Sequence, residues 1–337
     1  MSLEPIEFPN VVPDGVDVLD HEPEFNAQRH LQLEAAKNIY TLDDFGYSPE
    51  EISQCPSNIA LAGPFRILSE EGAGALLDVS RRLEVFKSRS ERIAAMVRYP
   101  AYRSKFIRDL ARNLDVAAFV GEQLQATIVP HSLTGVALAH FNYAPSKLGE
   151  PVDHWHHDVV GVDYVMAASD PSEWEGGRFE FFTGTKEEAR LVQGAGKQLP
   201  VERIVSVEFP GPGWVIAQQG NMVVHRGAPL KTLAERTTFL VCYVAANLDL
   251  PEANVIRDYT TMDPAHIVYP EWARHKAWLA RAKIDRLLET LPFTDNREVL
   301  IAALEDVRSE LDVAIEDIRD ETVSYLHRYD ESEEPSS

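Results

Sequence analysis

The stretch TTFLVCYVA, residues 237–245, is an unbroken run of β-branched, aromatic and other apolar residues, the composition of a strand buried in a sheet. Similar short runs precede it between residues 126 and 246, separated by turns rich in glycine and proline. The predicted strands cover residues 127–129, 135–143, 159–167, 177–183, 204–209, 214–217, 222–224 and 237–245. Short strands at this spacing favour a sandwich or barrel over alternating strand–helix units. The sequence therefore predicts a mainly β core.

Helices are predicted on both sides of this core. Ser69 is expected to cap a helix whose first turn holds Glu70 and Glu71. Further helical stretches are expected at residues 26–40, 90–97, 101–114 and 115–123, and again after residue 247. The predicted organisation is an N-terminal arm (1–60), helices plus the catalytic β domain (61–250), a helical extension (251–330) and a disordered polar tail (331–337).

The extension contains a long amphipathic helix. Asp295 and Glu298 are expected to form a capping box at its start. Its apolar residues recur at alternating spacings of four and three: Leu300, Leu304, Val307, Leu311, Ala314 and Ile318. This stripe is either a coiled-coil seam that joins two copies of the chain or a face that docks on the body. Docking is favoured because the pattern is short and Glu321 interrupts it.

Composition and charge narrow the class of protein. The net charge is −22, from 32 basic and 54 acidic residues, which opposes binding to nucleic acid. The two cysteines, Cys55 and Cys242, lie far apart, so we expect no disulfide framework and a cytoplasmic location. No apolar run is long enough for a membrane span, and the N-terminus does not resemble a secretory signal. Ten basic residues cluster within residues 81–112, either as solvated helix faces or as arginines that face an anionic substrate.

Three residues form a candidate metal site. The stretch DHWHHD, residues 153–158, places His156 and Asp158 two positions apart, so in an extended strand both side chains project to one side. His225, after the apolar residues 222–224, is the expected third ligand from a neighbouring strand. Two histidines and one carboxylate on one face leave three positions of an octahedron open.

A second element follows eleven residues after His225. Arg236 and Thr238 share one face of the last predicted strand, so a guanidinium and a hydroxyl can bind one carboxylate together. An arginine buried among the apolar residues 239–241 would be unfavourable without an anion.

This combination resembles the Fe(II)/2-oxoglutarate-dependent dioxygenase superfamily: His156-x-Asp158, a distal His225, and Arg236-x-Thr238. The runs GGRFEF (176–181) and GPGWVI (211–216) are also family-like, and the match covers about residues 126–246. Residues 65–71 loosely resemble phytanoyl-CoA-hydroxylase-like members. The resemblance implies a double-stranded β-helix (jelly-roll) core and an Fe(II) centre. It also implies 2-oxoglutarate as co-substrate, with its distal carboxylate on Arg236 and Thr238, and ascorbate as a stimulant of activity.

The resemblance also implies a reaction: oxidation of a small-molecule substrate, most simply hydroxylation, with release of succinate and CO2. Asn142 is expected to border the co-substrate, and the candidate substrate-binding residues are Tyr143, Trp155 and Arg226. Asn142 and Tyr143 face opposite ways, so one of them at most should reach the pocket. Desaturation, ring formation and epimerisation use the same ligands and stay open.

Several alternatives to this interpretation stay open. His154 and His156 could form a cupin-type ligand pair, but Val160 stands where that pattern requires a glutamate. His131 and His140 are expected to be packing or hydrogen-bonded histidines. The alternative functions are an oxygenase that acts on a protein side chain and a metal-binding jelly roll without catalytic turnover.

Overall fold

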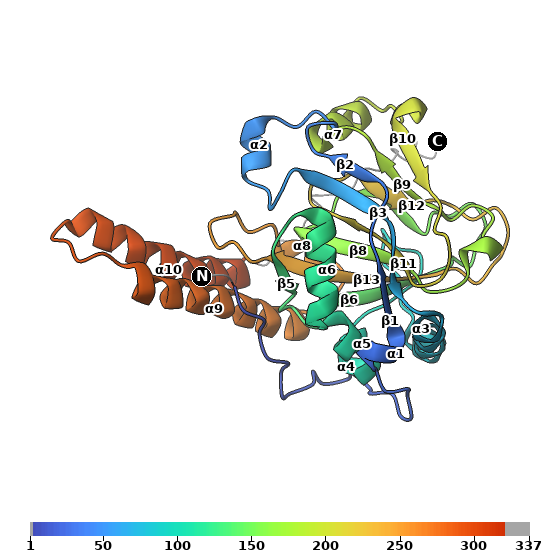
Figure 1. The fold of residues 1–337 in the computed structure, drawn as a ribbon, viewed down its shortest axis with the longest axis horizontal. Coiled ribbons are helices and arrows are strands. Elements are labelled where there is room, and N and C mark those ends of the chain that lie inside the picture. The colour runs from blue at the N-terminus through green and yellow to red at the C-terminus, as the bar shows by residue number, and fades with distance from the viewer. Residues whose placement is uncertain (1–2, 321–337) are drawn as a thin grey trace.

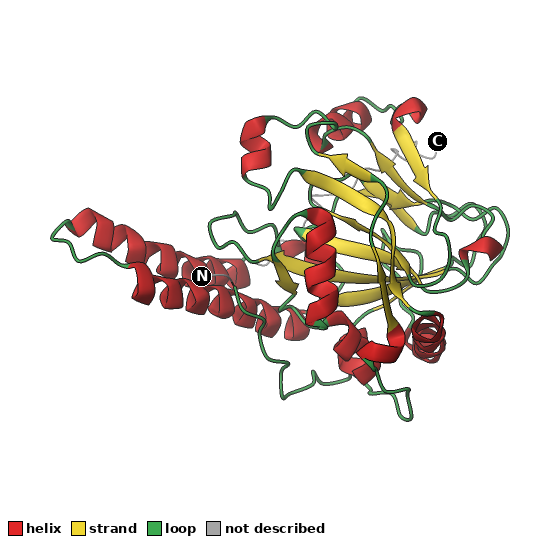
Figure 2. Ribbon diagram, in the orientation of Figure 1, coloured by secondary structure: helices red, strands yellow, loops and turns green. Residues whose placement is uncertain are grey.

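The computed structural model describes residues 3–320, and its core consists of two antiparallel β-sheets (Figure 2). The strands are β1 (Leu31–Glu34), β2 (Ile39–Thr41), β3 (Ile59–Leu68), β4 (Met96–Val97), β5 (Ile128–Pro130), β6 (Ala139–Tyr143), β7 (Asp153–His156), β8 (Val162–Ala167), β9 (Phe179–Phe182), β10 (Ile204–Val207), β11 (Trp214–Gln218), β12 (His225–Gly227) and β13 (Thr237–Ala245). The larger sheet has the order β1-β3-β11-β8-β13-β6-β4, with β2 beside β3 and β5 beside β13. The smaller sheet has the order β10-β9-β12-β7.

The chain crosses repeatedly from one sheet to the other. Strands β6, β8, β11 and β13 belong to the larger sheet, whereas β7, β9, β10 and β12 form the smaller one. Side chains from both sheets, such as Val165 and Ile216 from one and Phe179 and Phe181 from the other, pack in a single buried cluster. This connectivity is that of an eight-stranded jelly roll. It confirms the predicted double-stranded β-helix with helical flanks.

Strand β13 shows how the sequence assigns the two faces of the larger sheet. Phe239, Val241 and Tyr243 pack in the core cluster beneath the helices, and Leu240 contacts the cluster between the sheets. Because neighbouring residues of a strand project to opposite faces, positions 238 and 236 lie on the same inner side as Leu240. The predicted metal ligands His156, Asp158 and His225 also lie between the two sheets.

Helices cover the outer face of the larger sheet (Figure 1). The helices are α1 (Ala27–His30), α2 (Pro49–Ser53), α3 (Glu70–Leu83), α4 (Pro100–Arg103), α5 (Lys105–Ala111), α6 (Leu114–Leu124), α7 (Lys186–Gly194), α8 (Ile256–Thr260), α9 (Ala265–Thr290) and α10 (Arg297–Arg319). Leu76, Phe106 and Val120, from α3, α5 and α6, are fully buried against the sheet. The Ser69 hydroxyl accepts a hydrogen bond from the Gly72 amide at 3.0 Å, which confirms the predicted cap of α3.

Seven of the eight predicted strand runs overlap an observed strand, and residues 237–245 match β13 in full. The exception is residues 222–224, because the amides of Met222 and Val223 both donate to the Gln219 carbonyl and form a turn. Strand β12 begins only after this turn, at His225 itself.

Two predicted helices are wrong. In residues 26–40 the helix α1 ends at His30, and the chain continues as β1 and β2, which both pair with β3. Strand β3 itself was not predicted, and the expected arm boundary at residue 60 falls inside it. Residues 90–97 also form no helix; Ser88 and Met96 bridge across a loop instead. In both regions pairing to the sheet overrides local helix propensity.

The C-terminal extension forms a helical hairpin, α9 with α10, that projects from the body (Figure 1). The two helices are joined by ion pairs such as Lys276–Glu310 (3.1 Å) and Lys283–Asp306 (2.8 Å). The predicted stripe is divided: Ala314 is buried and Ile318 packs beside it, whereas Leu304 is 61% exposed. Helix α10 thus packs along α9, and only its C-terminal part, with Ala314 and Ile318, joins the cluster that also holds residues of the body.

Asn296, not Asp295, caps α10, because its side chain accepts a hydrogen bond from the Glu298 amide at 3.1 Å. The predicted disordered tail, residues 331–337, lies outside the described residues. Within residues 3–320 no helix is both long and apolar enough to cross a membrane.

Candidate metal centre

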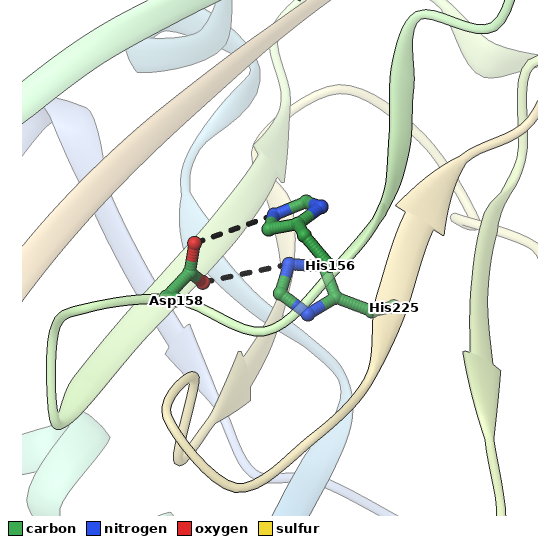
Figure 3. A group of neighbouring side chains, drawn as sticks. All are labelled: His156, Asp158 and His225. Carbon is green, nitrogen blue, oxygen red and sulfur yellow. Dashed lines mark ion pairs between the residues drawn. The ribbon is translucent and has the colours of Figure 1, made fainter. Parts of the chain in front are cut away.

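His156, Asp158 and His225 converge at one point between the sheets (Figure 3). His156 ends β7 and His225 begins β12, and the two are direct cross-strand partners. His156 Nε2 lies 3.3 Å from Asp158 Oδ1, and His225 Nε2 lies 3.5 Å from Asp158 Oδ2. One nitrogen or oxygen from each residue lies within 4.8 Å of the others. The three side chains predicted to share a metal therefore lie together.

Hydrogen bonds fix the orientation of both imidazole rings. Nδ1 of His156 lies 2.6 Å from the His154 carbonyl oxygen, and Nδ1 of His225 lies 3.0 Å from that of Val223. A carbonyl oxygen only accepts, so Nδ1 carries the proton in each ring and Nε2 keeps its lone pair. Both lone pairs belong to the nitrogens nearest the Asp158 carboxylate. This is the tautomer a metal ligand needs.

The protonation states of Asp158 and His225 also favour the binding of a cation. Burial would raise the pKa of Asp158, but His225, His156 and Arg92 together hold that pKa well below its ordinary value. Burial, together with His156, lowers the pKa of His225 to about 3, so its ring is neutral near pH 7. A metal ion could therefore bind the Asp158 carboxylate and the neutral His225 ring near pH 7 without first displacing a proton from either ligand atom.

A second carboxyl group, Asp163 on β8, lies behind the centre. It is 1% exposed, and burial together with the charge of Asp158 raises its pKa well above the ordinary value. The Gln218 amide nitrogen lies 3.1 Å from Asp163 Oδ1 and 3.2 Å from His225 Nε2. Asp163 and Gln218 therefore pack against Asp158 and His225 from the larger sheet, and a metal on His225 Nε2 would displace the Gln218 contact to that nitrogen. Neither residue was predicted to belong to the site, although a lone aspartate inside the apolar run 159–167 is a sequence signal for such a role.

Gly220 brings the backbone against the ligand Asp158. The Asp158 amide donates to the Gly220 carbonyl at 2.8 Å. A Cβ on Gly220 would lie 2.1 Å from Asp163 Oδ2 and 2.7 Å from Asp158 Oδ2, closer than any normal contact. Any side chain at position 220 must therefore move the Asp158 carboxylate.

We expect a Gly220→Ala variant to bind Fe(II) about 10- to 100-fold more weakly, the usual cost of disturbing groups that hold a ligand. Calorimetric titration of Fe(II) without oxygen measures the affinity. Gly194→Ala is the matched control, because a Cβ there meets no atom within 4 Å. Equal iron affinities for the two variants would contradict the role assigned to Gly220.

Arg236, Thr238 and Asn142 lie on the same inner face. Arg236 is 3% exposed; it donates from Nη1 to Thr238 Oγ1 at 3.1 Å and from Nε to the Gly177 carbonyl at 3.0 Å. Thr238 is the cross-strand partner of Asn142, whose Oδ1 is buried without a hydrogen-bond partner in the described chain. Burial lowers the pKa of Arg236 to about 10. Within residues 3–320 no carboxylate forms an ion pair with this guanidinium.

Three predicted substrate-binding residues face away from the centre. Tyr143 points to the helices and donates to the Ser80 carbonyl at 2.8 Å. Trp155 packs in a cluster that includes Val224 and lies under Arg226, 4.7 Å from its guanidinium carbon. Arg226 in turn donates to Glu180 at 2.8 Å. Each residue adjoins an inward-facing neighbour, so alternation along the strand sends it to the outer face. The structure therefore gives no support to the substrate role predicted for these three residues, which stays a prediction.

The other histidines differ in their surroundings. His131 is buried, and its Nε2 lies 2.9 Å from Asn254 Oδ1, as expected of a hydrogen-bonded packing residue. His140 instead lines a cavity that also reaches Asp158. His157 lines a separate cavity of about 310 Å³, between the Asp158 loop and the α9–α10 hairpin.

The fold and the site together define a jelly-roll protein with two histidines and one carboxylate on one inner face. No protein-family model matches the chain, and no curated protein matches its sequence. Among solved structures, the non-heme alpha-ketoglutarate-dependent carbocyclase SnoK from nogalamycin biosynthesis is similar, at 14% identity and a TM-score of 0.40, over 62% of this chain and 88% of that one.

Two further solved structures are similar to the same degree. EctD from S. alaskensis, with 2-oxoglutarate and 5-hydroxyectoine, has 14% identity and a TM-score of 0.42, over 74% of this chain and 91% of that one. The non-heme monooxygenase ThoJ, as a nickel complex, has 15% identity and a TM-score of 0.42, over 80% of this chain and 98% of that one. At these scores the likeness decides neither the reaction nor the substrate of the present chain.

Proposed function

We propose that this chain is an Fe(II)- and 2-oxoglutarate-dependent oxygenase that hydroxylates a small molecule. The observation that carries the proposal is joint: His156, Asp158 and His225 converge on one inner face, and a buried Arg236 without a carboxylate partner in the described chain lies on the same face. Neither group alone would indicate this class of enzyme.

The donor set fits Fe(II). Two imidazole nitrogens and one carboxylate oxygen, all within 4.8 Å of one another, can hold one ion and leave three coordination positions open. His156, Asp158 and His225 would hold the ion, and iron bound there would supply the redox chemistry that couples dioxygen to 2-oxoglutarate.

Arg236 and Thr238 fit the distal carboxylate of 2-oxoglutarate. The guanidinium already holds its orientation through Thr238 and Gly177, so its planar fork is fixed before an anion binds. Without an anion the burial of this cation is unfavourable. The buried Asn142, beside Thr238 in the sheet, supplies an additional polar contact.

The remaining task of the protein is to position the reactants and to exclude water. In the balanced reaction one substrate C–H bond, one O2 and one 2-oxoglutarate give C–OH, succinate and CO2. The apolar cluster between the sheets excludes water; its member Phe179 stacks on the His225 ring, with 5.3 Å between the ring centroids.

The proposal is tested by adding 2-oxoglutarate to the Fe(II)-loaded protein without oxygen. We expect a visible charge-transfer absorption from the chelated keto acid, and slow succinate release once oxygen is admitted. A protein that binds iron but forms no such absorption, and releases no succinate, would be a metal-binding jelly roll instead.

A further inference from the structure

A small cavity of about 80 Å³ adjoins the Asp158 carboxylate on the inner side of the larger sheet. Its walls are mainly apolar, with Val136, Val160 and Leu240 from the body and Met262 from the C-terminal extension. They also include three carboxyl groups, those of Asp158, Asp163 and Asp258. On this measure about 10–15 Å³ holds one water molecule. The cavity therefore admits the end of an organic molecule of a few carbon atoms, next to the candidate metal centre.

Two arginines from the basic segment 81–112 line this cavity, and they differ in their partners. Arg98 is fully engaged, because its guanidinium donates to both carboxylate oxygens of the buried Asp263. Arg92 is not: within residues 3–320 its guanidinium donates no hydrogen bond, and its Nε is buried. Arg92 therefore has two carboxylates in ion-pair range but donates a hydrogen bond to neither of them, so its donors are open to a further acceptor.

Ion pairs place Arg92 close to the metal ligands. Its Nη1 lies 3.8 Å from Asp158 Oδ1, and its Nε lies 3.2 Å from Asp153 Oδ1. A metal bound to Asp158 would take up much of the charge of that carboxylate, which leaves Arg92 with Asp153 as its counter-ion. The planar guanidinium could then bind a further carboxylate through the donors that face the cavity.

His140 adds a hydrogen-bonding ring nitrogen to the same wall. Its Nε2 is buried without a hydrogen-bond partner in the described part of the chain. Burial, with Arg98 and Arg92 nearby, lowers the pKa of His140 to about 3, so the ring is neutral and adds a hydrogen bond but no charge. A buried polar atom of this kind normally has a partner, and here a bound molecule can provide it.

We propose that this cavity binds the carboxylate-bearing end of an aliphatic substrate, with Arg92 as the anion-binding residue. The inference rests on the proposed function, because the cavity matters as a substrate site only if the metal centre is catalytic. Since Arg92 reaches a metal ligand, the oxidised carbon lies only a few bonds from the substrate carboxylate.

The test is a calorimetric titration of hexanoate and of hexanamide into the protein loaded with Fe(II) and saturating 2-oxoglutarate, without oxygen. We expect hexanoate to bind about ten-fold or more tightly than hexanamide, because a charge-assisted hydrogen bond is worth that factor. Arg92→Met should remove the preference, and Arg92→Lys should restore part of it. Arg89→Met is the matched control, since Arg89 is 71% exposed in an ion pair with Glu150.

Each outcome decides a different point. Equal binding of the acid and the amide to the wild type, or a preference that survives Arg92→Met, would overturn the inference. Hexanoate binding that weakens as 2-oxoglutarate rises would place the anion on Arg236 and overturn it as well. A missing charge-transfer absorption alongside an intact, Arg92-dependent preference would instead refute the proposed oxygenase and leave an anion-binding cavity.

Discussion

A His225→Ala variant is expected to bind Fe(II) about 100-fold or more weakly than the wild type, because it removes a direct donor, and even indirect supports of a ligand are worth 10- to 100-fold. The Nε2 atom lost is the one 3.5 Å from Asp158 Oδ2, and only two donor groups of the triad remain. Two groups do not fix the facial arrangement that leaves three coordination positions open. Succinate release should fall to background in the same variant.

Unfolding has to be separated from loss of the metal. The His225 ring stacks on Phe179, so truncation to alanine should also cost on the order of 2 kcal/mol of unfolding free energy. His225→Leu keeps an apolar side chain against Phe179 and should lose iron binding equally. His266→Ala, at an exposed position of α9, should bind iron like the wild type. Wild-type affinity for Fe(II) in either His225 variant would contradict the assignment of His225 as a metal ligand.

The convergence of the candidate metal ligands could be predicted from the sequence because their geometry is largely local. Residues two apart on a strand share a face, so His156 and Asp158 project together even though β7 ends at His156. Pairing of β12 with β7 then places His225 directly opposite His156. The same alternation directs Tyr143, Trp155 and Arg226, which adjoin inward-facing residues, to the outer faces of the sheets. For Asn142 and Tyr143 the alternation predicts that one at most reaches the pocket, and Asn142 is the residue that faces inward.

The residues that contact the candidate ligands from behind could not be predicted from strand alternation. Pairing between strands far apart in the sequence brings them to the site. Gln218 is brought beside Asp163 by the register of β11 with β8, and Gly220 lies in the turn that follows. Arg92 reaches Asp158 from a loop predicted to be helical, and nothing in the segment around it indicates that contact. Strand β3 was missed for a related reason: Gly63 and Pro64 interrupt a run that pairing with β11 nonetheless holds in the sheet.

Arg236→Met is expected to separate co-substrate binding from stability, with effects of opposite sign. The guanidinium offers the only strong charge-assisted contacts proposed for the distal carboxylate of 2-oxoglutarate. Loss of a charge-assisted pair should weaken that affinity about 10- to 100-fold. Calorimetric titration of 2-oxoglutarate into the Fe(II)-loaded protein measures it. Arg236→Lys keeps the charge but loses the planar guanidinium, so its affinity for 2-oxoglutarate should lie between those of the wild type and Arg236→Met.

The unfolding free energy of the same variant tests whether the burial of Arg236 is unfavourable without an anion. In the ligand-free protein Arg236 is a buried cation that has hydrogen bonds and a Trp174 ring 5.2 Å away, but no carboxylate in ion-pair range among residues 3–320. Replacing such a charge by an apolar side chain of similar length is commonly neutral or stabilising. The midpoint of thermal unfolding of ligand-free Arg236→Met should therefore equal or exceed that of the wild type.

Adding the co-substrate should reverse that order. At 100 times its wild-type dissociation constant, 2-oxoglutarate should stabilise the wild type by about 2.7 kcal/mol but Arg236→Met by only about 0.4 to 1.4 kcal/mol, given its 10- to 100-fold weaker affinity. Arg178→Met serves as control, because Arg178 is 49% exposed and pairs with Glu208 at the surface, so it should respond to 2-oxoglutarate like the wild type. A ligand-free Arg236→Met protein that loses several kcal/mol would instead mark Arg236 as a structural cation. Arg236 would then be buried because it stabilises the fold, and not because it binds 2-oxoglutarate.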